Sequence, residues 1–249
     1  HNTGIGAGAL LKNTDCRNVA IGYHSLLCNT SGESNTAIGY NSLDANTTAD
    51  NNTAIGRDSL TANTTGADNT TVGTCSMLAN TTGQQNNVLG KQALCANTTG
   101  SFNSVFGHRA LFSNTTADNN TAIGYLAMNA NTTGLQNVSV GACSNHGSTT
   151  ACYTVAIGEK TFLATNTGNG NTTVGQSSMR CNTSGANNTN IGRNGLCANI
   201  SGSSNTAIGS DSLKSNTTAS SNTAVGYCSL RANTTASENT AVGHNALTA

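Results

Sequence analysis

The chain has 249 residues, of which 8% are charged and 4% aromatic, and its formal net charge is zero. This balance argues against a nucleic-acid partner, because such proteins carry a basic patch or stripe. No apolar run of about 18 residues occurs, so we expect no membrane-spanning helix. Low charge with abundant Asn, Thr, Ser and Gly would suit a disordered chain, but the apolar residues recur at fixed spacing.

A five-residue pattern similar to Asn-Thr-Ala-Ile-Gly recurs fifteen times along the chain. Its glycines are spaced by 17 residues, apart from a first interval of 16. These glycines are Gly6, Gly22, Gly39, Gly56, Gly73, Gly90, Gly107, Gly124, Gly141, Gly158, Gly175, Gly192, Gly209, Gly226 and Gly243. Such regular self-similarity predicts a solenoid, in which each repeat forms one coil stacked on the last.

We number the positions of each repeat from its Asn, so that residues 35–51 occupy positions one to seventeen. The consensus is N-T-A-I-G-x-x-S-L-x-A-N-T-T-G-x-x. Glycine at position five and paired threonines disfavour a helix. We predict two short strands, Thr-Ala-Ile at positions two to four and Leu-x-Ala-Asn-Thr at nine to thirteen, with turns at the Gly and near position fifteen. The predicted fold is an all-β parallel β-solenoid (a β-helix or β-roll) of about fifteen 17-residue coils.

Position four is always apolar, and position nine is apolar in every repeat except the one that contains Asn145. If these two positions face inward, strand alternation also buries positions two, eleven and thirteen and turns three, five, twelve and fourteen outward. Each coil would then bury about two large side chains. At roughly 1.5–3 kcal/mol each, they cannot offset the ordering entropy of the coil, so stacking must supply the rest.

Asparagine occupies position one in fourteen of the fifteen repeats, with Thr154 as the exception. Stacked amides can hydrogen-bond to one another as they do in cross-β ladders. A second Asn column lies at position twelve, where eleven members begin the N-glycosylation pattern Asn-x-Ser/Thr on a predicted outward face. These candidates are Asn29, Asn46, Asn63, Asn80, Asn97, Asn114, Asn131, Asn182, Asn199, Asn216 and Asn233. The sequence leaves open whether they carry glycans or serve only as turn residues.

Nine cysteines favour an oxidising, extracellular setting. Stacking would bring equivalent positions of neighbouring coils within about 5 Å, inside the range that disulfides need. The candidate pairs are Cys181 with Cys197, Cys75 with Cys95, Cys16 with Cys28, and Cys143 with Cys152. Cys228 is left over, either buried or bridging to another subunit.

Cys143, His146 and Cys152 can also be read as metal ligands. A local bulge stapled by a disulfide is the favoured interpretation, because no second cysteine pair stands at zinc-finger spacing. No acid, base and nucleophile recur together along the chain. We therefore expect no enzymatic activity, no cofactor and no resident metal.

The string Asn-Thr-Ala-Ile-Gly at residues 120–124, followed by Ala-Met at 127–128 and Asn-Thr-Thr-Gly at 131–134, resembles the repeats of bacteriophage tail fibres. It is also similar to a lengthened head repeat of trimeric autotransporter adhesins, in which an Ala-Ile-Gly strand recurs. The resemblance covers the whole chain. It implies an extracellular β-solenoid, often trimeric, that is used as a stalk or an adhesive fibre.

We expect one elongated repeat domain over residues 1–249. Because its terminal repeats lack polar caps, we expect it to continue in a longer array or in a head-to-tail filament of copies of itself. The expected function is a structural extracellular fibre at a cell or virion surface, coated by glycans if the second Asn column is used. Alternatives are an adhesin-head or tail-fibre segment that binds a host surface, and an ice-binding solenoid, which would need two outward Thr columns on one strand. Outward Ala and Gly at positions three and five would suit lateral trimers.

Overall fold

The computed structural model describes residues 1–248 and contains fifteen strands and, within those residues, no helix. The strands are β1 (Thr3–Ile5), β2 (Val19–Ile21), β3 (Thr36–Ile38), β4 (Thr53–Ile55), β5 (Thr70–Val72), β6 (Asn87–Leu89), β7 (Ser104–Phe106), β8 (Thr121–Ile123), β9 (Val138–Val140), β10 (Val155–Ile157), β11 (Thr172–Val174), β12 (Thr189–Ile191), β13 (Thr206–Ile208), β14 (Thr223–Val225) and β15 (Thr240–Val242). The chain is an all-β parallel β-solenoid of about 14 coils of about 17 residues, which confirms the predicted fold class.

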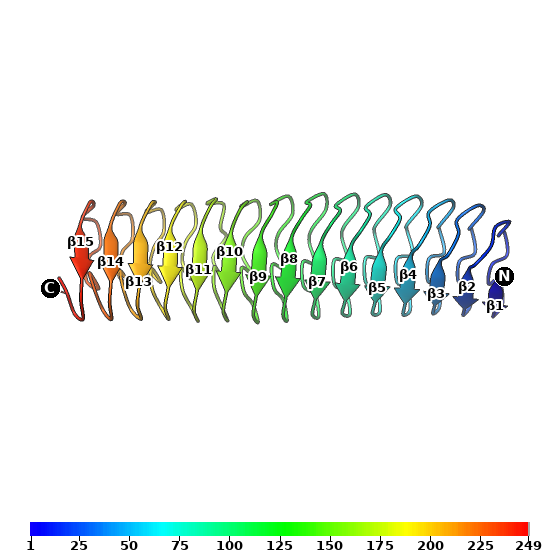
Figure 1. Cartoon of the computed structure of the whole chain (residues 1–249), viewed down its shortest axis with the longest axis horizontal. Coiled ribbons are helices and arrows are strands. Elements are labelled where there is room, and N and C mark those ends of the chain that lie inside the picture. The colour runs from blue at the N-terminus through cyan, green and yellow to red at the C-terminus, as the bar shows by residue number, and fades with distance from the viewer. Residues whose placement is uncertain (249) are drawn as a thin grey trace. The chain divides into compact units, whose positions relative to one another are not determined.

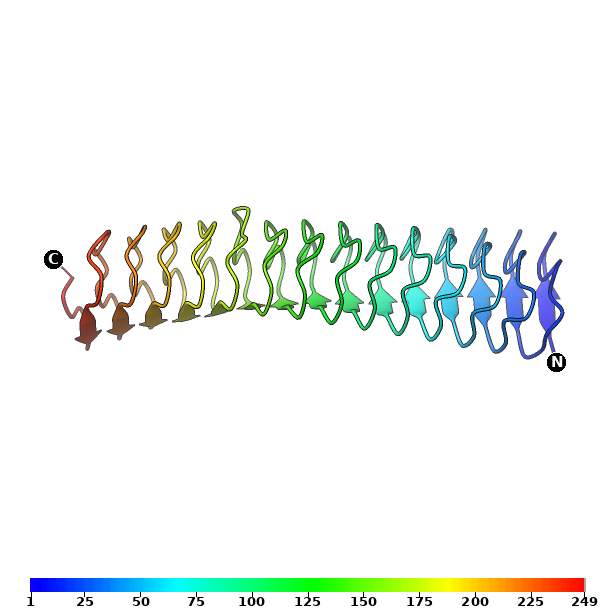
Figure 2. The same cartoon turned by 90° about the horizontal axis from the view of Figure 1, so that it is seen from above.

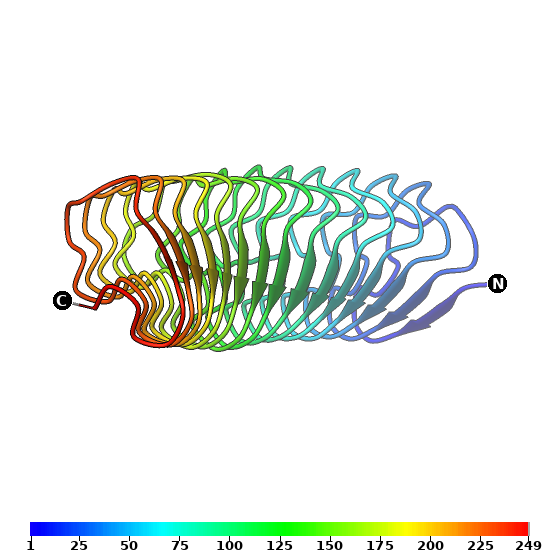
Figure 3. The same cartoon turned by 60° about the vertical axis from the view of Figure 1, so that its left-hand side comes forward.

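Two compact units divide the chain, His1–Ala122 and Ile123–Ala249. Within each unit the strands lie side by side in chain order and pair in parallel (Figure 1, Figure 2). The register is one repeat, so that Thr36 pairs with Thr53 in the first unit. Equivalent residues of successive coils therefore form columns, and the strands make one wall of each coil (Figure 3).

Each coil has one strand and not the two that the repeat predicts. Positions nine to thirteen form turns, because the backbone φ is positive at positions seven and nine, as at Asn41 (51°) and Leu43 (53°). Residues with a left-handed backbone conformation alternate here with residues of negative φ, and this alternation prevents an extended strand. Backbone hydrogen bonds still join these turns from coil to coil, for example from Leu43 N to Ser59 O at 3.1 Å.

The residue types found at position nine fit this left-handed backbone conformation. Its members are Leu, Met and Phe, together with Asn145, and none is Val, Ile or Thr. A β-branched side chain at positive φ is a steric outlier, whereas side chains that are unbranched at Cβ occupy this region at lower cost. The left-handed backbone thus explains why the apolar residues of position nine differ in kind from the Ile and Val of position four.

The strands are turned the opposite way from the sequence prediction, so that position three faces inward and positions two and four face outward. Ala37 at position three is fully buried, whereas Thr36 and Ile38 at positions two and four lie on the outer face and are only half-buried. The inward orientation of position nine is confirmed, since Leu43 is fully buried. Because this leucine fills the narrow interior from the opposite turn, the facing strand position holds a smaller side chain, most often alanine, and the larger aliphatic side chain points outward.

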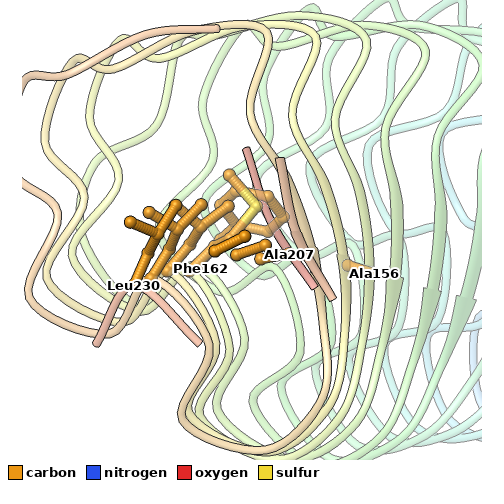
Figure 4. Close-up of a cluster of buried hydrophobic side chains, with 9 residues drawn as sticks. Ala156, Phe162, Ala207 and Leu230 are labelled. Atoms are coloured by element: carbon orange, nitrogen blue, oxygen red, sulfur yellow. The ribbon is translucent and has the colours of Figure 1, made fainter. Parts of the chain in front are cut away.

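In the second unit the large side chains of position nine pack in a row against the alanines of position three (Figure 4). The cluster comprises Phe162, Met179, Leu196, Leu213, Leu230, Ala156, Ala207, Ala224 and Ala241. Burial of each large side chain contributes about 1.5–3 kcal/mol. Since the neighbouring coils supply much of that burial, each coil is stable only within the stack.

Asn145 interrupts this column in the coil before Phe162. Its side chain is fully buried, and neither amide atom has a hydrogen-bond partner. We expect Asn145→Leu to raise the free energy of unfolding by about 1–3 kcal/mol, because it removes an unsatisfied buried amide. Denaturant titration measures the change. Asn145→Asp, which has a similar shape but carries a charge, should lower the free energy of unfolding. A lower midpoint for Asn145→Leu would mean that Phe162 already fills this space.

Candidate functional surfaces

The asparagines of position twelve lie inside the coils and not on the predicted outward face. Ten of the eleven glycosylation candidates are fully buried, namely Asn29, Asn46, Asn63, Asn80, Asn97, Asn114, Asn131, Asn182, Asn199 and Asn216. Asn233 is half-buried. The outward orientation was wrong because the amide is needed to close the turn that follows it. Asn97 Nδ2, for example, donates to Gly100 O at 2.9 Å.

The same amides form a ladder between coils. Asn97 Nδ2 donates to Asn80 Oδ1 at 2.8 Å, and Asn114 Nδ2 donates to Asn97 Oδ1 at 2.9 Å. Each amide of this kind closes its own turn and bonds to the coils on both sides. A buried amide that lost these partners would cost about 1–3 kcal/mol, so the ladder ties each coil to its neighbours.

A glycan has no room at a fully buried amide, and attachment would replace one of the Nδ2 protons that the ladder uses. Modification of these ten residues would therefore have to precede folding, and it would then prevent the coils from stacking. In the folded chain the Asn-x-Ser/Thr pattern serves turn closure and stacking. Occupancy of the half-buried Asn233 stays a prediction.

The amide ladder predicted for position one is confirmed. Asn69 Nδ2 donates to Asn52 Oδ1 at 3.2 Å, and Asn69 N donates to the same oxygen at 3.0 Å. The amide also reaches across its coil to Gly83 O at 2.9 Å. This column therefore connects the strand to the opposite turn as well as one coil to the next.

The outer strand face, formed by positions two and four of the strands, has a different character. No charged residue occurs at either position in any of the fifteen repeats. Its aliphatic side chains are partly exposed to solvent, as at Ile191 (46%). Over β5 to β7 a shallow depression of about 330 Å³ is lined by Leu89 and Phe106, among others. A contiguous exposed apolar surface of this kind commonly marks an interaction site.

The outer strand face is nearly as uniform from coil to coil as the interior. Position four is Ile, Val, Leu or Phe throughout, and position two is Thr in ten of the fifteen repeats. Among the other solvent-facing positions, six and ten vary widely and include Tyr, Lys, Arg, His, Glu, Asp and Leu, whereas the exposed position fourteen is Thr or Ser in every repeat after the first that extends to it. Packing inside the coil constrains the interior positions, and contact with equivalent side chains on the neighbouring strands constrains this face.

The nine cysteines carry free thiols in this structure. Two of the four predicted pairs lie on neighbouring coils and close together. Burial raises the pKa of the Cys95 thiol, and the nearby Cys75 raises that pKa further. Cys181 N donates to Cys197 O at 3.1 Å, which places these two residues at adjacent positions of the coil-to-coil ladder.

The other two predicted pairs have separate surroundings. Cys28 Sγ lies 3.9 Å from Lys12 Nζ, which donates to it, whereas Cys16 lies in the turn near position fifteen. Cys143 and Cys152 bond to positions six and sixteen of the preceding coil, which lie in different turns. The structure does not bring either pair together, and their linkage stays a prediction.

We expect mild oxidation to join Cys181 to Cys197, because their backbones are already neighbours. Burial raises the pKa of Cys197, and the thiolate is the reactive form, so the rate of linkage should increase as the pH rises above neutral. Mass spectrometry of peptides prepared without reduction measures the link. Cys16 and Cys28 are the internal control, and a link between them that formed equally fast would contradict the expectation.

Within residues 1–248, Asp15, Cys16 and Glu33 place three potential metal-ligand atoms within 4.8 Å of one another. Arg17 forms an ion pair with Glu33, so a cation at this half-buried turn would compete with a guanidinium. The three residues around Cys143 that the sequence offers as metal ligands form no such group among the described residues. Neither set has the closed shell of four ligands that a structural zinc site needs.

No family model, no curated protein and no solved structure matches this chain. In the described part of the chain, no helix is long and apolar enough to cross a membrane.

Proposed function

We propose that this chain is a structural segment of an extracellular fibre made of stacked coils. The observation that carries the proposal is the position-twelve ladder, in which Asn97 donates to Asn80 in one neighbouring coil and accepts from Asn114 in the other. Each coil is thus stabilised by the coils on both sides, and the stability of the stack is a sum of contacts between neighbouring coils. Such an arrangement suits length and stiffness, and it supports a scaffold role.

The proposed location is the outside of a cell or virion. Nine cysteines favour an oxidising setting, and the resemblance to tail-fibre and adhesin-head repeats points the same way. The proposed partners are further copies of this chain, stacked end to end or packed side by side. Because ten of the position-twelve asparagines are buried, we leave a glycan coat on that column out of the proposal.

Immunogold electron microscopy of the cells or virions that carry this chain tests the proposal. We expect the label on thin filaments at the surface, and we expect the purified chain to appear in negative stain as a thread of constant width. Label confined to the cell interior, or compact round particles of the purified chain, would reject a role as an extracellular fibre.

A second candidate function is attachment to a host surface, which the depression over β5 to β7 favours. Leu89 and Phe106 are 49% and 41% exposed there, and large apolar side chains in a shallow pocket suit a protein contact. Binding of the fluorescently labelled chain to host cells would measure it. Phe106→Ser should then weaken the binding, and unchanged binding would exclude this depression as the contact.

A further inference from the structure

Strands β11 to β15 carry the most regular part of the outer strand face. Position two is Thr in all five strands, and position four is Val or Ile. The pairs are Thr172 and Val174, Thr189 and Ile191, Thr206 and Ile208, Thr223 and Val225, and Thr240 and Val242. Each pairs in register with its equivalent on the next strand, so the face is a column of hydroxyls beside a column of aliphatic side chains.

The hydroxyls of this Thr column are not used by the protein. Thr189, Thr206 and Thr223 make no side-chain hydrogen bond within the described residues. The Thr column of position thirteen behaves differently, because Thr183 Oγ1 donates to Ile200 O at 3.0 Å and Thr217 Oγ1 donates to Thr234 O at 3.1 Å. The two columns have the same side chain, but only on the outer strand face are the hydroxyl groups available to bond to a partner outside the chain.

The array is also rigid and evenly spaced. Thr, Val and Ile are branched at Cβ and have few χ1 rotamers on a strand. Neighbouring strands lie about 4.8 Å apart, and positions two and four of one strand lie roughly 6.6 Å apart. Methyl and hydroxyl groups therefore repeat on a fixed two-dimensional lattice. A rigid lattice of this kind is complementary to a partner that is itself periodic.

We propose that the outer strand face of β11 to β15 binds ice. Its methyl groups order the water beside them, and its unused hydroxyls can donate to and accept from water molecules held at the lattice spacing. No charged side chain is present on this face to hold a competing hydration shell. The sequence argued against ice binding because alternation left no strand with two outward Thr columns. The face of β11 to β15 has one Thr column, and its second column, of Val and Ile, supplies methyl groups without hydroxyls.

A protein partner suits this part of the face less well. Hot spots of protein interfaces are rich in Trp, Tyr and Arg, whereas Thr and Val are under-represented, and β11 to β15 offer only Thr, Val and Ile. In β6 and β7 of the first unit, Asn87, Leu89 and Phe106 replace the regular residues and interrupt the lattice. We therefore assign ice binding to the second unit and not to that depression.

Thermal hysteresis and ice-crystal shaping of the full chain test the proposal. We expect the wild-type chain to lower the freezing point below the melting point and to facet ice crystals. Thr206→Lys, which places a charge in the middle of the lattice, should abolish most of the hysteresis. Thr218→Lys is the matched control, because Thr218 is an exposed threonine outside the strand, and it should leave the hysteresis unchanged.

Circular dichroism confirms that each variant folds, and Thr223→Lys replaces Thr206→Lys if the latter does not. Absence of hysteresis and of ice shaping in the wild-type chain would overturn the proposal. So would equal loss in the strand and control variants. Self-association of the wild-type chain that Thr206→Lys disrupts, without any effect on ice, would show that a second copy occupies this face. None of these results depends on whether the chain forms fibres, because hysteresis is measured in solution.

Discussion

Gly90→Ala is expected to destabilise the stack by roughly 3–5 kcal/mol. Gly90 has φ of 147°, a region that side chains rarely enter, and an added Cβ would lie 2.7 Å from the carbonyl carbon of Gly107 in the next coil. That atom belongs to the backbone and cannot rotate away, so two coils would have to separate. Denaturant titration measures the loss, and hydrogen exchange should show it first in the coils that contain Gly90 and Gly107.

Gly100→Ala is the matched control for this experiment. Its Cβ would also meet the next coil, 2.5 Å from Ala117 O, but the φ of Gly100 lies in the ordinary region. Alanine already stands at the same position in other coils, as at Ala49 and Ala117. We expect a clearly smaller loss of stability. Equal losses in the two variants would mean that crowding between coils, and not the backbone conformation, makes glycine necessary at position five.

Asn97→Asp is expected to cost roughly 3–5 kcal/mol at neutral pH. Asn97 is fully buried, and its Nδ2 donates both to Asn80 Oδ1 and to Gly100 O. A carboxylate has no proton for either acceptor, so the variant would bury a charge against two oxygen atoms. Denaturant titration measures the loss, and Asn187→Asp, at an exposed position, is the control and should change stability little.

The cost of Asn97→Asp should also depend on pH. Burial beside two oxygen atoms raises the pKa of the new carboxyl group in the folded state. A raised folded pKa means that stability is greatest below the unfolded value of about 3.9 and is lost as the pH rises through the folded value. The variant should therefore approach the wild-type chain in acid. Equal losses at pH 4 and pH 7 would show that shape, and not charge, decides the cost.

The period of the repeat was enough to predict the solenoid, because a fixed interval of 17 residues has one simple structural cause. It was not enough to predict which side of the strand faces inward. Both Ile38 and Leu43 are large and apolar, and alternation alone permits either to be buried. The coil is too narrow to hold both, so Leu43 enters the interior and Ile38 remains outside. The width of the interior is a property of the closed coil, and it cannot be deduced from the alternation of residues along one strand.

Uniformity between coils is the signal that would have corrected the error at position twelve. Asn97 and its equivalents hardly vary, whereas the exposed positions six and ten change freely from coil to coil. The sequence also shows coupled substitutions, in which a change at one position of the repeat accompanies a change at another. Where Asn190 replaces alanine at position three, position eight becomes Gly195, because a Cβ there would collide with the Asn190 amide. Position four is uniform although only partly buried, and contact with its equivalents on the neighbouring strands favours the β-branched residues found there.

The interruption of the position-twelve ladder in the second unit has a mechanical consequence. Ser148 stands there in place of asparagine, its Oγ bonds only to Asn166 O at 3.4 Å, and the Asn166 Nδ2 has no partner. At most other junctions of the unit a pull along the stack is shared by two amide columns and the strand ladder. In the coil of Asn166 the position-one asparagine is also replaced, by Thr154, whose backbone N donates to Asn137 Oδ1 at 2.9 Å. At Ser148 one of those parallel connections is weak, so the load on the others is greater. A solenoid under tension breaks at its weakest junction, and in the second unit that junction is the coil where Ser148 meets Asn166.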